Sequence, residues 1–178
     1  MNALEQTNEI KVLISAQEIQ KKVWEIAEKL NEKYGTNEEL TLICVLSGSV
    51  IFFSDLVRCL KMPTKLEFIK VSSYENSLTT GIIKEVLFNL PNLKEKDIVI
   101  VEDIVDTGIT AKYLIDRITK DFHPKSLCFV SLFDKKCTRK IDVHPDIYGF
   151  DIGNKFIVGY GLDYDGYYRN LPYIGYIE

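Results

Sequence analysis

An uninterrupted apolar run that leads directly into a cluster of acids is the feature that most constrains this chain. Ile98 to Val101 contains no polar residue, so both faces of a strand here are expected to be buried, as in a central parallel strand. Three acids follow within five residues, and beyond Thr110 apolar residues recur at helical spacing. The pattern predicts a strand, an acidic turn and a helix. In open α/β sheets, ligands bind at that end of a strand.

The turn after this strand combines two kinds of binding chemistry. The segment Thr107–Thr110 offers hydroxyl groups and the backbone N–H groups of a helix N-terminus, where phosphate binds readily. Glu102, Asp103 and Asp106 repel phosphate, but carboxylates accept hydrogen bonds from ribose hydroxyls and bind Mg²⁺. A ribose 5-phosphate with a second, metal-bound phosphate group fits both halves. Taken alone, the segment is explained equally well as a buried strand that ends in solvated acids.

Length and composition indicate one globular domain. A chain of 178 residues with 46% hydrophobic and 27% charged residues can bury a core without disulfides. Its net charge of −4 gives no support to a broadly basic nucleic-acid surface, and no apolar run approaches the ~20 residues that span a membrane. The N-terminus lacks a signal-peptide layout, and the four cysteines have no CxxC spacing. A reduced, cytoplasmic protein without a zinc site is expected.

Strands and helices are expected to alternate along the rest of the chain. Ser15 and Glu18 match a capping box, and the apolar stripe that follows ends near Gly35. A second helix is expected over Val50–Leu60. The further strands expected are Lys11–Ile14, Leu40–Leu46, Lys65–Val71, Ile83–Leu90, Ser126–Phe133, Tyr148–Ile152 and Lys155–Val158.

The segment Val101–Thr110, with the sequence VEDIVDTGIT, resembles the phosphoribosyl-pyrophosphate (PRPP) signature of type I phosphoribosyltransferases. Its Glu-Asp opening, with Asp-Thr-Gly three residues on, is most similar to the hypoxanthine-guanine branch. Four motifs resemble the family in the same order, over about residues 10–178. The resemblance implies an α/β fold with a mostly parallel central sheet flanked by helices. It also implies a single domain, residues 1–178, with a small hood formed mainly by residues 148–178 and the N-terminal arm.

The resemblance implies a residue set for PRPP. The implied PRPP-binding residues are Glu102, Asp103, Asp106, Thr107, Gly108, Ile109, Thr110, Leu46, Ser47, Gly48 and Arg169. Asp106 is the implied catalytic residue, which assists proton transfer near purine N7. The implied Mg²⁺ partners are Glu102, Asp103 and Asp163.

The sequence departs from the family at two positions of this set. Ser47 stands where a basic residue is usual, and Ile109 where one is frequent. Ser47 leaves the backbone contacts of the Leu46–Gly48 loop possible but removes one positive charge. The family also implies a cis peptide bond between Leu46 and Ser47. Judged alone, the segment is more typical of an ordinary loop between a strand and a helix.

Further resemblances concern a lid and the purine. Ser73 and Tyr74 stand where the family's lid loop begins. Lys135 matches a lysine that hydrogen-bonds the exocyclic oxygen of a 6-oxopurine. The implied purine-binding residues are Lys135, Phe156, Ile157 and Asp163, with Phe156 stacking on the base. The corresponding alternatives are a hairpin tip, a solvated strand-end lysine, and a tyrosine-rich C-terminal surface or partner-binding patch.

The expected reaction joins hypoxanthine, and guanine, to PRPP, giving IMP or GMP and pyrophosphate in purine salvage, with Mg²⁺. A homodimer or homotetramer is expected, without nucleic-acid or membrane partners. The nearest alternatives are a xanthine-preferring or an adenine-type transferase. Two others are a ligand-sensing RNA-binding regulator on the same fold and a nucleotide-binding subunit without catalysis.

Overall fold

The computed structural model describes residues 10–74 and 82–177. In chain order the elements are β1 (Lys11–Ile14), α1 (Ala16–Tyr34), β2 (Leu40–Leu46), α2 (Val50–Val57), β3 (Thr64–Tyr74), β4 (Ile82–Leu87), β5 (Asp97–Val105), α3 (Ile109–Phe122), β6 (Ser126–Asp134), the 3₁₀ helix η1 (Lys136–Thr138), β7 (Ile147–Asp151), β8 (Ile157–Val158) and β9 (Ile174–Tyr176). Within these ranges no helix is both long and apolar enough to cross a membrane.

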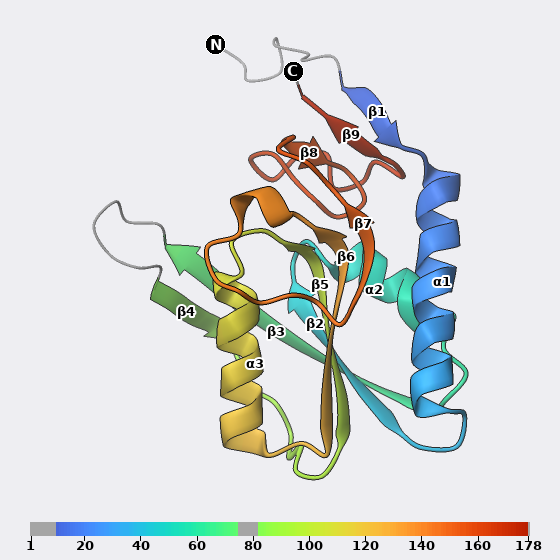
Figure 1. Ribbon diagram of the computed structural model, residues 1–178, viewed down its shortest axis with the longest axis vertical. Coiled ribbons are helices and arrows are strands. Elements are labelled where there is room, and N and C mark those ends of the chain that lie inside the picture. The colour runs from blue at the N-terminus through green and yellow to red at the C-terminus, as the bar shows by residue number, and fades with distance from the viewer. Residues whose placement is uncertain (1–9, 75–81, 178) are drawn as a thin grey trace.

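Six strands form the larger sheet, in the order β4-β3-β2-β5-β6-β7. Neighbouring strands are parallel except for β3 and β4, which are antiparallel. β5 is an interior strand between β2 and β6, as its apolar run predicts. Helices α1 and α2 cover one face and α3 covers the other (Figure 1). The predicted fold class, a mostly parallel sheet with helices on both faces, is confirmed.

Side chains alternate between two apolar layers along the interior strands. Leu42 and Cys44 of β2 join Phe52 of α2 on one face, whereas Ile43 joins Leu114 of α3 on the other. All five side chains are fully buried. Burial of a large apolar side chain contributes about 1.5–3 kcal/mol, so both layers hold the interior strands firmly. The loops at the carboxyl ends of these strands therefore project from a fixed base.

Helix α1 begins and ends where the sequence predicts. Ser15 Oγ accepts a hydrogen bond from the Glu18 N–H at 3.3 Å, and the Glu18 carboxylate accepts one from the Ser15 N–H at 2.8 Å. This is the predicted capping box. Gly35 ends the helix with φ at +72°. Trp24, which lies off the apolar stripe, is 57% exposed.

Several elements differ in length from the prediction. Helix α2 ends at Val57 rather than Leu60, because the N–H groups of Cys59 and Leu60 bond to carbonyls three residues earlier, as in a 3₁₀ turn. β8 begins at Ile157 rather than Lys155, and β4 ends at Leu87. β3 extends to Tyr74. The side chains of Ser73 and Tyr74 and residues 75–81, where the lid is expected, lie outside the described residues.

The smaller sheet has the order β1-β9-β8 and lies beyond the carboxyl ends of the parallel strands (Figure 1). β9 pairs antiparallel with both β1 and β8, so N-terminal and C-terminal residues share this sheet. β7 pairs with β6 and belongs to the larger sheet. After β8, the Tyr160 hydroxyl donates to Asp55 Oδ2 of α2 at 2.6 Å, and Gln20 of α1 donates to the same oxygen at 2.8 Å. These bonds fix the C-terminal segment against both helices.

Candidate active site

The turn Thr107–Thr110, expected to bind phosphate, joins β5 to α3. Gly108 has φ at +84°, and a Cβ there would lie 2.8 Å from the Ile141 carbonyl oxygen, so glycine is needed. The Thr107 carbonyl oxygen accepts hydrogen bonds from the N–H groups of Lys140 at 2.9 Å and Ile141 at 3.1 Å. The following loop therefore anchors the turn, and the N-terminus of α3 lies directly behind it, where an anion is favoured.

A pocket of about 310 Å³ opens beside this turn. The residues that line it are Glu102, Ile104, Val105, Asp106, Thr107, Gly108, Thr110 and Ala111. One cavity thus brings together two of the three acids and most of the predicted phosphate turn. Asp103 and Ile109 are not among its lining residues. The pocket can receive a ligand that presents a phosphate at one end and hydroxyl groups at the other.

The two adjacent acids at the end of β5 are held in an unfavourable environment for charge. Burial raises the pKa of Glu102 well above its ordinary value, and the charge of Asp103 raises it further. Burial also raises the pKa of Asp103 to about 6, although a 3.0 Å hydrogen bond from the Ile104 N–H opposes the rise. Cations or hydroxyl donors would relieve this cost by stabilising the carboxylates.

The Leu46–Gly48 loop lies directly against Asp103. Its Leu46–Ser47 peptide bond is cis, as the resemblance implies. A Cβ on Gly48 would lie 1.7 Å from Asp103 Oδ2, and a Cβ on Gly161 would lie 2.0 Å from the Gly48 carbonyl oxygen. Side chains are thus excluded where the three segments meet, and Ser47 is exposed beside them. This stack of Asp103, Gly48 and Gly161 joins the end of β5, the Leu46–Gly48 loop and the C-terminal segment.

Asp163 and Arg169 form an ion pair next to this stack. Arg169 Nη2 lies 2.7 Å from Asp163 Oδ1, and Arg169 Nη1 donates to the Gly161 carbonyl oxygen at 2.7 Å. The Gly166 N–H donates to Asp163 Oδ2 at 2.8 Å. The positive charge of Arg169 lowers the pKa of Asp103 and the negative charge of Asp163 raises it, against the larger effect of burial. The structure therefore brings Asp163 and Arg169 close to Asp103.

The predicted purine-binding residues lie on two separate segments. The Lys135 N–H donates to the Val105 carbonyl oxygen at 2.9 Å, whereas its side chain has no hydrogen bond to any described residue. Phe156 is 53% exposed, and its ring meets Tyr164 edge to face at a centroid distance of 5.6 Å. Ile157 is buried in β8. The lysine amine and one aromatic ring are therefore available to a planar ligand.

Sequence reasoning missed the residues that surround Asp106. The Thr138 hydroxyl donates to the Asp106 carboxylate, and Arg139 Nε donates to the Asp106 carbonyl oxygen at 2.9 Å. Arg139 also pairs with Asp134, which is fully buried. The run Asp134–Lys140 is polar and follows a strand, which is typical of a solvated loop. No periodic pattern in this run indicates that the Arg139 side chain bonds to the backbone of Val105 and Asp106.

Comparisons with known proteins agree with this geometry. The family model for the phosphoribosyl transferase domain matches residues 12–165. Hypoxanthine-guanine phosphoribosyltransferase of Bacillus subtilis is 41% identical over 169 residues, which cover 94% of this chain and 93% of the relative. The crystal structure of the enzyme of that name from Bacillus anthracis matches with a TM-score of 0.90 at 41% identity, covering 96% of this chain and 100% of that one. The hypoxanthine phosphoribosyltransferase of Trypanosoma cruzi, solved as a ternary complex with its substrates, matches with a TM-score of 0.87 at 36% identity and 96% coverage of both chains.

Proposed function

Because the chain belongs to the phosphoribosyl transferase family, we propose that it is a purine-salvage enzyme that joins hypoxanthine or guanine to PRPP. The products are IMP or GMP and pyrophosphate. The observation that carries the proposal is the pocket in which Glu102 and Asp106 meet the turn Thr107–Thr110. This pocket suits a molecule with both ribose hydroxyls and a 5-phosphate.

The proposed reaction breaks the C1–O bond of PRPP to pyrophosphate and forms a bond from C1 to a purine nitrogen. Positive charge develops on the ribose and negative charge on the leaving group. Backbone N–H groups of the Leu46–Gly48 loop and the Arg169 guanidinium would stabilise the leaving pyrophosphate. The turn Thr107–Thr110 would hold the 5-phosphate, and Asp106 would accept a purine proton near N7. Lys135 and Phe156 would hold the base.

We propose Mg²⁺ as the metal. Glu102 and Asp103 offer hard oxygen donors, and the raised pKa values of these two acids are what a nearby cation would offset. No group of three or more His, Cys, Asp or Glu suited to a metal occurs in the ranges that the structure describes. Proteins usually hold Mg²⁺ by one or two carboxylates together with substrate phosphates. Asp163, which lies next to the stack that contains Asp103, would be a further partner of the metal. When bound, Mg²⁺ supplies charge neutralisation for the pyrophosphate.

The raised pKa of Asp103 predicts a pH-dependent stability. An acid whose pKa is higher in the folded chain than in the unfolded chain weakens the fold once it ionises. For Asp103 this loss is absent below about pH 4 and grows as the pH rises through 6, to about 3 kcal/mol. Metal-free Asp103→Asn cannot ionise there, so its stability relative to the wild type should rise between about pH 4 and pH 6 and level off above that. Urea unfolding at each pH measures the difference.

The same variant should need more Mg²⁺ and PRPP than the wild type and should be stabilised less by the two together. A stability difference from the wild type that stays constant across this pH range would contradict the assigned environment of Asp103. Undiminished affinity for PRPP with Mg²⁺ would remove its proposed binding role.

Because Gly161 packs against Gly48 in the stack with Asp103, we expect Gly161→Ala to weaken PRPP binding. Its new Cβ would lie 2.0 Å from the Gly48 carbonyl oxygen and so displace the loop proposed to bind pyrophosphate. Gly166→Ala is the matched control, because Gly166 also has a positive φ, at +83°, but has no atom within 4 Å of an added Cβ. Both variants should lose stability, by about 1 kcal/mol from backbone strain. Only Gly161→Ala should also raise the Kd for PRPP, about 10-fold, which is worth 1.4 kcal/mol. Equal PRPP affinities in calorimetry would show that the close contact is unimportant.

One assay tests the proposed function. Protein, PRPP and Mg²⁺ are mixed with hypoxanthine, guanine, xanthine or adenine in turn, and nucleotide is measured by chromatography. Formation of IMP and GMP supports the proposal, and a clear preference for xanthine would support the nearest alternative. Absence of turnover together with salt-sensitive RNA binding would instead favour the regulatory function.

We further propose a homodimer or homotetramer in the cytoplasm. Apolar side chains remain exposed on α2 and β3, among them Ile51, Leu66 and Phe68, and such surfaces favour association. Light scattering in solution tests the assembly, and cell fractionation tests the location.

A further inference from the structure

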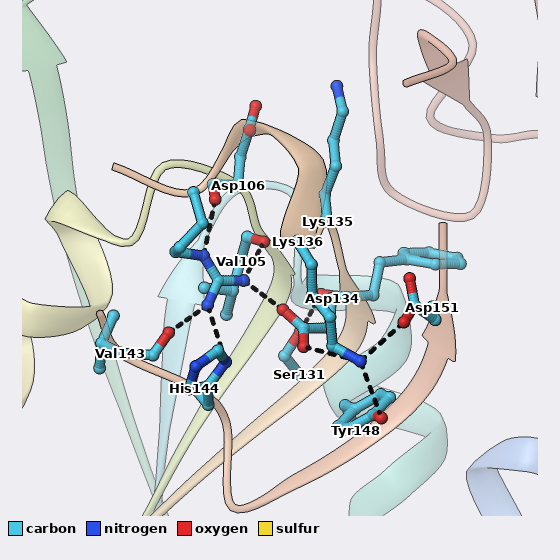
Figure 2. A network of polar contacts seen from close by, with 12 residues as sticks. Val105, Asp106, Ser131, Asp134, Lys135, Lys136, Val143, His144, Tyr148 and Asp151 are labelled. Carbon is cyan, nitrogen blue, oxygen red and sulfur yellow. Dashed lines mark hydrogen bonds and ion pairs between the residues drawn. The ribbon is translucent and has the colours of Figure 1, made fainter. Parts of the chain in front are cut away.

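The guanidinium of Arg139 is buried and fully hydrogen-bonded. Its side chain is 9% exposed. A guanidinium has five N–H donors, and each of those in Arg139 has a partner. The partners are the carbonyl oxygens of Val105 at 3.1 Å, Asp106 at 2.9 Å and Val143, the Asp134 carboxylate and the ring nitrogen Nδ1 of His144 at 3.3 Å. All five partners are labelled in Figure 2, where dashed lines mark the contacts.

These contacts join the carboxyl ends of β5 and β6. Val105 ends β5 and leads directly to Asp106, whereas Asp134 ends β6 and leads directly to Lys135. Arg139 bonds to both ends, and the Lys135 N–H closes the link by donating to the Val105 carbonyl oxygen. A lysine with three donors on a single nitrogen could not bridge these groups in the same way. Val105 and Asp134 already pair in the sheet, and Arg139 adds a side-chain bridge that holds the residues after them in place.

Thr138 adds a second link at the same place. Its hydroxyl donates to the Asp106 carboxylate and also lies 3.3 Å from the Lys135 carbonyl oxygen. The Lys135 side chain extends away from the polar network (Figure 2). Side chains of η1 and of the residue after it thus hold Asp106 in place, and the Lys135 amine bonds to none of the residues that the structure describes.

We propose that Arg139 and Thr138 are positioning residues that hold Asp106 and Lys135 in register with each other. The inference rests on the proposed function, in which Asp106 accepts the purine proton and Lys135 donates a hydrogen bond to the purine oxygen. Both residues contact the same base, so an error in their separation misplaces the base relative to C1 of the ribose. Misplacement by about 1 Å can cost ~10²-fold in rate. Arg139 and Thr138 thus act on catalysis without touching the substrate.

Thr138→Val, which keeps the side-chain shape and removes the hydroxyl, is the central test. We expect kcat to fall about 10-fold, within that range, with the Kd for PRPP within about two-fold of the wild type. Thr138→Ser restores a hydroxyl and should recover most of the rate. In an Asp106→Asn background, Thr138→Val should cause little further loss, because the two residues act through one contact. Equal losses in both backgrounds, or no rescue by serine, would show a merely structural role.

Arg139→Lys tests the bridge itself. Removal of one partner from a buried ion pair is strongly destabilising, so lysine, which keeps the charge, is preferred to a neutral residue. Amide hydrogen exchange at Lys135, whose N–H bonds to Val105, should accelerate in this variant. Arg117→Lys, which changes an arginine paired with Glu85 on the surface, is the control and should leave this exchange unchanged.

The two proposals fail separately. If the wild type makes no nucleotide from any oxopurine, the proposed function fails, and the assignment of catalytic positioning fails with it. Exchange at Lys135 then still reports whether Arg139 joins the strand ends. If the wild type is active but Thr138→Val and Arg139→Lys match it in kcat and exchange, the positioning role alone is overturned.

Discussion

Replacement of Lys135 by alanine is expected to lower kcat/KM for hypoxanthine and guanine by about 10–100-fold, with PRPP binding nearly unchanged. The range corresponds to loss of one hydrogen bond from a charged donor, about 1.5–3 kcal/mol. Lys135 follows β6 with its backbone fixed by Val105 and with no side-chain partner among the described residues. Its amine is therefore available to the oxygen at C6 of an oxopurine.

The same lysine predicts that the wild type rejects adenine. A charged lysine has only donors, and adenine carries an amino donor at C6 where oxopurines carry an acceptor. Sites built around one specific hydrogen bond reject a mismatched analogue by up to ~10⁴–10⁵-fold. Steady-state kinetics with hypoxanthine, guanine and adenine measure both effects.

Lys136→Ala is the matched control for Lys135→Ala. It removes the same charge from the adjacent position, but Lys136 lies 2.7 Å from the Asp151 carboxylate and over the ring of Tyr148. Purine preference should therefore not change in this variant. Appreciable adenine conversion by the wild type, or a Lys135→Ala variant with unchanged oxopurine kinetics, would show that Lys135 is an ordinary solvated lysine.

Much of the fold could be predicted from the sequence, because its signals are local and periodic. The unbroken run at Ile98 places β5 inside the sheet, and the Ser15–Glu18 pair sets the start of α1. Element ends were less predictable, since they depend on tertiary contacts. β8 is short because the chain before Ile157 stays exposed, and the segment that begins at Ile147 pairs with β6 in the larger sheet. No local pattern distinguishes that strand from one in the smaller sheet.

Part of the candidate site could likewise be predicted from local sequence, whereas the rest depends on tertiary contacts. Its acids and the turn predicted to bind phosphate are adjacent in sequence, so the sequence alone indicates that they lie together. The approach of Gly161 to Gly48 joins residues more than a hundred positions apart, and glycine has no side chain whose chemistry could indicate it. Arg139 was missed for another reason: its partners are mostly backbone carbonyls, which every sequence has. The resemblance to a family supplied roles for residues but not the bonds that hold them.

Asp106→Asn is expected to lower kcat at least about 10-fold, and general acid–base catalysis is typically worth ~10²–10⁴-fold. Asn has nearly the same shape as Asp, and its amide oxygen can still accept the hydrogen bond from Thr138. What it cannot do is take up a proton from the purine. The Asp106 backbone also stays in place, because Arg139 and not the carboxylate holds its carbonyl oxygen.

PRPP should therefore still bind to the Asp106→Asn variant, so that kcat falls while the Kd for PRPP changes little. Calorimetry with PRPP and Mg²⁺ measures binding, and rapid-quench kinetics measure the chemical step separately from product release. Asp116→Asn, a change of an exposed acid that pairs with Lys112 on α3, should leave both quantities unaltered. If kcat of Asp106→Asn instead matches the wild type from about pH 5 to about pH 9, another group accepts the proton. The Thr138–Asp106 contact would then serve the structure of the turn and not the chemistry.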